Sequence, residues 1–153
     1  MEFSDVIKNR YSCKKFSSEQ IGKDKLDAIL EAGRVAPTAK NLQEQHIYVV
    51  QSESALETID KLTPCRYNAP TVLIVAFNKN NVFTYPGDKR NSGIEDATIV
   101  ATHLMLAACN EGVDSCWINF FNPDELAKAF NLPEDEEILM LLDLGVADKT
   151  TTP

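Results

Sequence analysis

Two stretches of this sequence are apolar without the alternation that marks a half-exposed strand. Residues 71–77 read TVLIVAF, and residues 137–146 read EILMLLDLGV. A strand that is apolar on both faces has to be covered on both faces, usually by helices. The chain has 153 residues, the length of one ordinary domain. We therefore expect a single domain over residues 1–153, folded as a layered α/β or α+β sandwich.

Residues 94–110 form the longest helical pattern, and this pattern is apolar almost all the way round. Such a helix is expected to be fully buried. One domain of this size offers little room to bury it alone, so the pattern predicts a homodimer with this helix at the interface. Gly112 suits the C-terminal cap.

The remaining elements follow from periodicity and from capping residues. Residues 78–93 are polar and rich in turn formers, which predicts a surface excursion. Helices are expected from Ser4 or Asp5 to Asn9 and over 23–34, 53–62 and 123–130, and strands over 46–50 and 115–121.

The charge balance limits the classes of partner. The sequence has 15 basic and 23 acidic residues, a net charge of −8. Nucleic acids and anionic membrane surfaces need a basic footprint, so neither is an expected partner. The N-terminal segment has no apolar signal region, no apolar run is long enough to span a bilayer, and the four cysteines lack CxxC spacing. These features favour a cytoplasmic location.

A short basic segment, RYSCKKF at residues 10–16, stands out against this acidic background. Arginine offers a planar fork for two phosphate oxygens, lysine a point charge, and serine a hydroxyl group. A solvated face is the ordinary explanation of such a run. A phosphate site is the alternative that its neighbours in the sequence favour.

Most recognisable catalytic motifs are missing. The sequence contains no GxGxxG, no GxxxxGK[ST] and no GxSxG. His46 and His103 are not spaced with other ligands as in a zinc site, so no metal is expected, and His103 is interpreted as a core histidine. Glu95 and Asp96 are interpreted as favourable charges at a helix N-terminus. A phosphate cradle without a protein nucleophile suits an enzyme whose chemistry is carried by a cofactor.

Three segments in order resemble the nitroreductase family of FMN-dependent oxidoreductases. RYSCKKF at 10–16 resembles the family's R-x-S-x-[RK]-x-F opening, and APTAKNLQ at 36–43 resembles its AP[ST]xxNxQ loop. Residues 96–108, Gly112 and the segment Cys116-Trp117-Ile118 resemble its central helix and the strand after it.

The resemblance implies an α+β fold, a layered sandwich whose central, mostly antiparallel sheet is flanked by helices. It also implies a homodimer with FMN at the interface and no catalytic side chain, because the flavin carries the chemistry. NADH or NADPH would reduce the flavin, and nitroaromatic, quinone or related acceptors would reoxidise it in ping-pong order. Arg10, Tyr11, Ser12 and Lys14 would bind the phosphate and ribityl end. The other subunit would bring Pro37, Thr38, Ala39 and Asn41 to the ring, and Trp117, Ile118 and Asn119 would lie at its opposite edge.

The sequence departs from the family pattern at three places. Glu44-Gln45 stands where Pro-Trp is usual, and His103 stands at a position that is commonly Asn. Family members also usually continue past the position of Pro153 with an arm that carries a further cation to the phosphate, so the resemblance predicts weaker FMN binding by the printed sequence. Two alternatives to an enzyme stay open, namely a flavin-binding storage or redox-sensing protein and an acidic dimeric scaffold.

Overall fold

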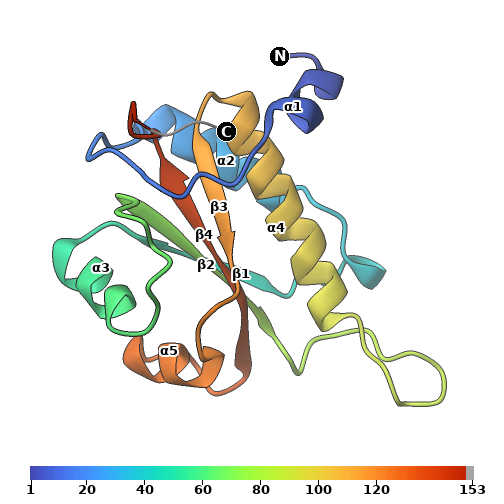
Figure 1. Ribbon diagram of the computed structural model, residues 1–153. Helices are drawn as coiled ribbons and strands as arrows, with labels where there is room; N and C mark the ends of the chain where they lie inside the picture. Colours follow the sequence, from blue (N-terminus) through green and yellow to red (C-terminus); the bar gives the residue numbers. More distant parts are fainter. Residues whose placement is uncertain (151–153) are drawn as a thin grey trace.

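Four strands form the sheet of the computed structural model, which describes residues 1–150 (Figure 1). Their order across the sheet is β1-β2-β4-β3, and each neighbouring pair is antiparallel. The strands are β1 (Gln45–Val50), β2 (Thr71–Asn78), β3 (Asp114–Ile118) and β4 (Glu136–Gly145). The two stretches that were apolar without alternation are β2 and β4, and they form the centre of the sheet.

Helices cover both faces of this sheet. Alternate residues of β2 confirm it, because Leu73 and Val75 face one buried cluster while Val72 and Ile74 face the other. The expected layered α+β architecture is therefore confirmed. The helices are α1 (Phe3–Asn9), α2 (Lys23–Arg34), α3 (Glu53–Asp60), α4 (Gly93–Asn110) and α5 (Pro123–Ala129), with one short turn of 3-10 helix, η1 (Ala39–Asn41).

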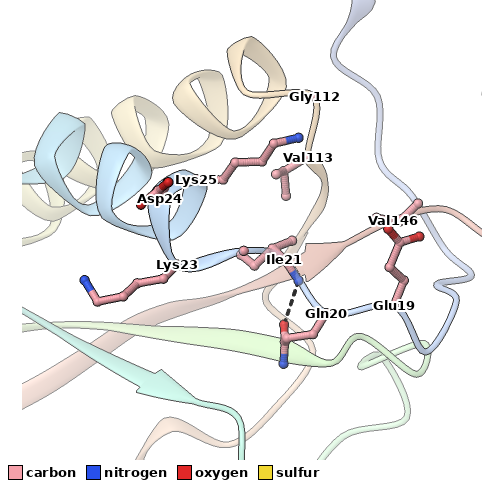
Figure 2. A pocket seen from close by; sticks show the side chains of 10 residues that line it. Glu19, Gln20, Ile21, Lys23, Asp24, Lys25, Gly112, Val113 and Val146 are labelled. Atoms are coloured by element: carbon pink, nitrogen blue, oxygen red, sulfur yellow. Dashed lines mark hydrogen bonds between the residues drawn. The ribbon is translucent and has the colours of Figure 1, made fainter.

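Helices α2 and α4 pack on the face that holds Leu73 and Val75. They approach closely at Gly33, where a Cβ atom would lie 2.6 Å from Cδ2 of Leu104. The chain enters α2 beside the end of α4, and a hollow of about 470 Å³ lies there between residues 19–25, the turn at 112–113 and Val146 (Figure 2). This hollow contains none of the residues predicted for a cofactor site.

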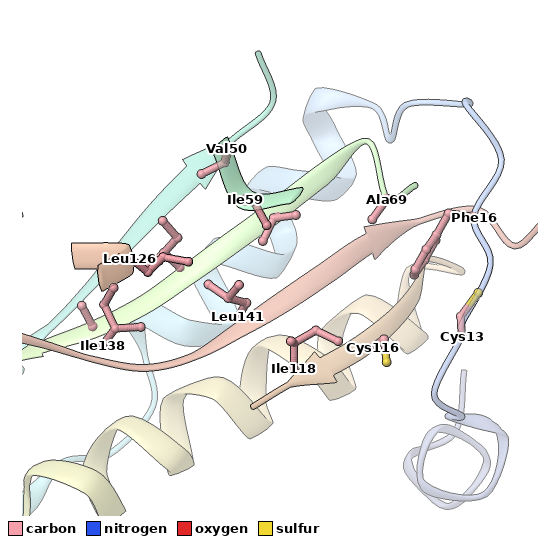
Figure 3. Packing of buried hydrophobic residues seen from close by; sticks show 13 residues of the cluster. Cys13, Phe16, Val50, Ile59, Ala69, Cys116, Ile118, Leu126, Ile138 and Leu141 are labelled. Atoms are coloured by element: carbon pink, nitrogen blue, oxygen red, sulfur yellow. The ribbon is translucent and has the colours of Figure 1, made fainter. Parts of the chain in front are cut away.

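Helices α3 and α5 cover the opposite face, which holds the cluster drawn in Figure 3. Ile59 of α3 and Leu126 of α5 are fully buried there. Cys13 and Phe16 from the basic segment join the same cluster. β4 also carries Asp143 to this side, where burial raises the pKa of its carboxyl group to about 9. Asp143 is therefore held neutral at pH 7.

The expectation that the 94–110 helix is fully buried is wrong for the single chain. One half of α4, including Val100 and Leu104, is buried against α2 and the sheet. On the other half, Ile94 is 60% exposed and Ile99 is 38% exposed. Periodicity revealed that both halves are apolar, but it could not show which half this chain covers.

Several predicted boundaries also shift. α1 begins at Phe3 after Glu2 rather than at Ser4 or Asp5, and no side chain caps it. The cap of α4 is Glu111, and Gly112 follows it with φ of +72°, the left-handed conformation that glycine adopts readily. The strand predicted over 115–121 ends at Ile118, because only residues up to Ile118 pair with β4.

The polar stretch 78–93 is the predicted surface excursion, closed by an isolated bridge between Thr84 and Asn91. In residues 1–150, none of the helices combines the length and apolar character that crossing a bilayer would require. Pro153, where the printed sequence ends, lies outside the residues that the structure describes.

Replacing Leu104 with alanine is expected to lower the free energy of unfolding by about 2–5 kcal/mol, because it opens a cavity between α2 and α4. Denaturant unfolding of the apo-protein measures this change. Val49→Ala is the matched control, since Val49 is 41% exposed on β1. A loss from Leu104→Ala no larger than that from Val49→Ala would contradict the packing described here.

Candidate functional site

The basic segment is held against the edge strand β3. Ser12 forms an isolated parallel bridge with Ser115, and the backbone N–H of Cys13 donates to the carbonyl oxygen of Ser115 at 2.8 Å. The buried side chains of Cys13 and Phe16 anchor the segment in the core. On either side of Cys13, the side chains of Ser12 and Lys14 are left exposed. The sequence thus folds so that its polar residues face outward along β3.

Two of the three cations in this segment, Arg10 and Lys14, are available for a ligand, whereas Lys15 donates a hydrogen bond to Thr150 at 3.0 Å. Within residues 1–150, neither the guanidinium group of Arg10 nor the ammonium group of Lys14 forms an ion pair or a side-chain hydrogen bond. Arg10 and Tyr11 line a small hollow of about 170 Å³ together with residues from the end of α4 and the start of β3. Burial, with a smaller effect of Asp114, raises the pKa of Tyr11 to about 12, so its hydroxyl group stays neutral at pH 7.

The predicted residues 117–119 lie farther along the same strand. Ile118 points into the cluster of Figure 3, whereas Trp117 packs on the α4 side of the sheet. Nε1 of Trp117 donates to Oδ1 of Asn119 at 2.8 Å, which orients the Asn119 amide just past the strand end. A hollow of about 690 Å³ opens beside Asn119, lined by apolar residues that include Leu62, Pro64 and Phe120.

The loop that carries the second motif has an unusual backbone. Lys40, Asn41 and Gln43 all have positive φ angles between 51° and 54°. The backbone N–H of Gln43 donates to Oγ1 of Thr38 at 2.9 Å, and Nε2 of Gln43 donates to Oδ1 of Asn41 at 2.8 Å. Such strained residues persist only where their surroundings fix them, and they gather at functional sites. Pro37 is exposed at the start of this loop.

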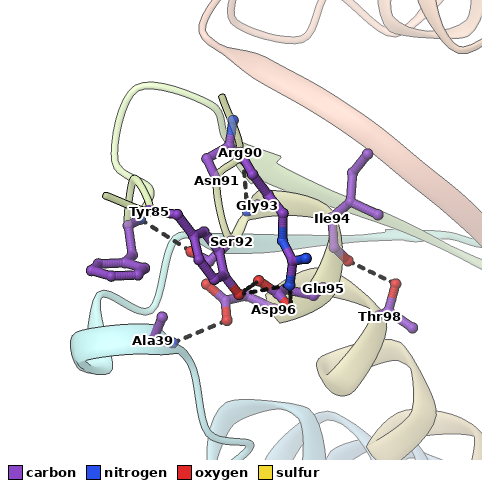
Figure 4. A network of polar contacts seen from close by, with 11 residues as sticks. Ala39, Tyr85, Arg90, Asn91, Ser92, Gly93, Ile94, Glu95, Asp96 and Thr98 are labelled. Carbon is purple, nitrogen blue, oxygen red and sulfur yellow. Dashed lines mark hydrogen bonds and ion pairs between the residues drawn. The ribbon is translucent and has the colours of Figure 1, made fainter. Parts of the chain in front are cut away.

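Asp96 fixes the loop to the first turn of α4. Its Oδ1 atom accepts a hydrogen bond from the backbone N–H of Ala39 at 3.0 Å (Figure 4). Asp96 is only 3% exposed. Asp96 does lie in the first turn of α4, as its interpretation as a favourable helix N-terminal charge requires. That interpretation did not include its hydrogen bond to Ala39, which lies 57 residues away in the sequence.

Within one chain, the predicted site residues form two separate sets. One set lies along β3 and consists of residues 10–14, beside the strand, and residues 117–119, at its C-terminal end. In this set, Arg10 lies beside Cys109 in the last turn of α4. The 37–41 loop contacts Asp96 in the first turn of the same helix. Asp96 and Cys109 are 13 positions apart in α4, which places these two turns about 20 Å apart along the helix axis. Figure 1 shows η1 and the basic segment beside opposite ends of α4.

Sequence reasoning missed the burial of Glu44. This residue follows the 37–43 loop, and it is 3% exposed. Burial and the neighbouring Asp96 raise the pKa of its carboxyl group to about 7. No local pattern predicts this, because an acidic residue between a polar loop and an edge strand normally faces solvent. His103 is only partly buried, and its Nδ1 atom lies 3.2 Å from the carbonyl oxygen of Ala32.

Comparison with known proteins supports the three-segment resemblance. The sequence profile of the nitroreductase family matches residues 7–66 and 64–146. A Bacillus subtilis strain 168 relative, provisionally named the NAD(P)H nitroreductase YodC, is 28% identical over 95% of this chain and 89% of its own.

Solved structures match along the full chain. A nitroreductase family protein from Clostridium difficile 630 is 33% identical with a TM-score of 0.95, covering 100% of this chain and 88% of that one. A nitroreductase with bound FMN from Bacteroides fragilis NCTC 9343 is 25% identical with a TM-score of 0.85, covering 100% of this chain and 92% of that one. The profile match extends from α1 to the end of β4, and with the shared fold it shows that this chain belongs to the nitroreductase family.

Proposed function

We propose that this protein binds FMN along the β3 edge, with the phosphate at Arg10, Ser12 and Lys14. The observation that carries the proposal is the pair of cations that have no ion-pair partner in residues 1–150, held beside an exposed serine hydroxyl on an otherwise acidic chain. Charge-assisted hydrogen bonds of this kind suit a phosphate dianion. The flavin ring would lie toward Trp117 and Asn119. The Bacteroides fragilis relative, which has FMN bound, supports this choice of cofactor.

The proposed functional unit is a homodimer. Within one chain, the 37–41 loop contacts the first turn of α4 and Arg10 lies beside its last turn, two turns that are about 20 Å apart along the helix axis. The loop of a second copy would therefore supply the contacts expected on the ring. An apolar face supports such an assembly. It includes a hollow of about 340 Å³ between α1, α2 and α4, which Phe3, His103 and Leu106 help to line. Ile94 and Ile99 extend the apolar surface along α4.

The proposed reaction transfers hydride from NADH or NADPH to an acceptor such as a nitroaromatic compound or a quinone. FMN supplies the redox chemistry when it is bound, and the residues of this chain bind and orient it. The apolar hollow beside Phe120 and Pro64 suits a flat, poorly hydrated acceptor. Because nicotinamide and acceptor would use the same pocket in turn, ping-pong order is expected.

Anaerobic reduction of the purified protein tests this function. The protein reconstituted with FMN is expected to lose its yellow absorbance when NADH or NADPH is added, and to regain it with a nitroaromatic compound or a quinone. Failure to bind FMN would contradict the proposal and favour a scaffold. Binding without reduction by either nucleotide would favour the alternative of a flavin-storage or redox-sensing protein.

A further inference from the structure

A pair of buried carboxyl groups lies where the 37–43 loop meets α4. Glu44 comes directly after the loop, and its backbone carbonyl accepts from the N–H of Asn78 at 2.9 Å, which ties this point to the end of β2. Its side chain is buried, and within the described part of the chain neither carboxylate oxygen accepts a hydrogen bond from a cation or from the backbone of another residue. Burying an ionised carboxylate without a donor is costly, so this arrangement needs an explanation.

Asp96 supplies the explanation from the other side. Its Oδ1 atom already accepts from Ala39, while Oδ2 is buried and has no donor in residues 1–150. Burial raises the pKa of Glu44 to about 7. The hydrogen bond from its own backbone N–H lowers this pKa, whereas the hydrogen bond and the charge of Asp96 raise it. Two ionised carboxylates can only accept hydrogen bonds, so they cannot form one with each other. If the Glu44 carboxyl group carries one proton, it can donate a hydrogen bond to the Asp96 carboxylate.

The charged groups around Glu44 and Asp96 do not form ion pairs with these two carboxyl groups. Arg90 is engaged at the surface with Tyr85 and Glu95 (Figure 4). His46 on β1 pairs with Glu136 on β4, and Asp135 accepts from the side chain of Asn78 at 3.2 Å. Lys40 of the loop is exposed. Among the residues that the structure describes, Arg90, His46 and Lys40 form no ion pair with Glu44 or Asp96.

We propose that Glu44 and Asp96 share one proton, and that Glu44 is a positioning residue that holds Asp96, and through it the 37–43 loop, in the geometry needed to contact the flavin. The inference rests on the proposed function, because it assigns the loop to the FMN site. Loss of the proton would place two negative charges side by side in a buried site. The repulsion would loosen the hydrogen bond between Asp96 and Ala39, and FMN binding would weaken.

The sign of the pH effect follows from the direction of the shift. In the unfolded chain, Glu44 would titrate near its ordinary pKa of 4.5, whereas in the folded protein its pKa is raised to about 7. The folded state therefore holds an extra proton between these values. Its contribution to stability is full below the unfolded pKa and is lost as the pH rises through the folded pKa.

Glu44→Gln is the test variant, because the Gln amide keeps a donor for Asp96 and does not titrate. Glu137→Gln is the matched control, since Glu137 is an exposed residue of β4. The Tm of the apo-protein is measured from about pH 5 to about pH 8, a range that spans most of the shift. Wild type and Glu137→Gln are expected to lose more thermal stability over this range than Glu44→Gln. Parallel profiles for all three proteins would overturn the shared proton.

FMN titration of the same three proteins tests the link to the loop. Between about pH 6 and pH 8, Glu44 loses its proton in wild type and in Glu137→Gln, whereas Gln at position 44 does not titrate. The Kd of these two proteins is therefore expected to rise about tenfold more over this range than the Kd of Glu44→Gln. The FMN phosphate also titrates in this range, but it changes the Kd of all three proteins equally, so it does not affect the difference between them. Equal pH dependence of Kd would overturn the positioning role. Absence of FMN binding in every protein would contradict the proposed function instead, and the Tm profiles would still decide whether the proton is shared.

Discussion

Replacing Arg10 with alanine is expected to weaken FMN binding by roughly one to two powers of ten. A hydrogen bond to a charged group contributes about 1.5–3 kcal/mol, and about 1.4 kcal/mol corresponds to a tenfold change in Kd. Arg10 is partly buried beside Tyr11, so solvent screens it less than a fully exposed cation. Lys14→Ala is expected to have a smaller effect, because Lys14 is exposed and offers a point charge rather than a planar fork.

Fluorescence titration of the apo-protein with FMN, at low and high ionic strength, measures both effects. Lys128→Ala is the control, since it removes an exposed cation from α5, far along the chain from the basic segment. The loss caused by Arg10→Ala should shrink as salt is added, because screening already weakens the contact in the wild type. Wild-type affinity in both Arg10→Ala and Lys14→Ala would show that the phosphate binds elsewhere.

Replacing Ile99 with aspartate is expected to dissociate the proposed dimer and, with it, to remove tight FMN binding. Ile99 lies one turn before His103 and two turns before Leu106 on the same side of α4, so it continues the apolar surface around the α1–α2–α4 hollow. A carboxylate placed in an apolar interface without a partner would be strongly unfavourable. Since each flavin site would need residues from two copies, dimer and cofactor stabilise each other.

Sedimentation velocity and FMN titration on the same sample measure this loss. Ile99 is already partly exposed in the single chain, so the variant is expected to remain folded by circular dichroism. Val49→Asp is the control for an exposed apolar residue on the sheet, and it is expected to leave the assembly unchanged. A wild-type protein that sediments as a monomer with flavin bound would contradict the dimer, as would a fully dimeric Ile99→Asp protein.

The candidate site was only partly predictable from the sequence. The basic segment was visible because Arg10 and Lys14 stand out on an acidic chain, and its attachment to β3 follows from the buried anchors Cys13 and Phe16. The strain of the 37–43 loop was not visible, since Lys40 and Asn41 carry no sequence signal for positive φ as strong as glycine. The role of Asp96 was also hidden, because a helix-start carboxylate normally faces water.

The sequence by itself determined the layered α+β architecture. Strands β2 and β4 are apolar on both faces, and such strands have to be covered on both faces, usually by helices. Only the tertiary structure decided which half of α4 this chain covers, that the 37–43 loop and Arg10 lie beside opposite ends of α4, and that Glu44 is buried against Asp96. The physical reason is that periodicity records the chemistry of each face within an element. Burial, separation and a raised pKa depend on contacts between residues far apart in the chain, which no local pattern records.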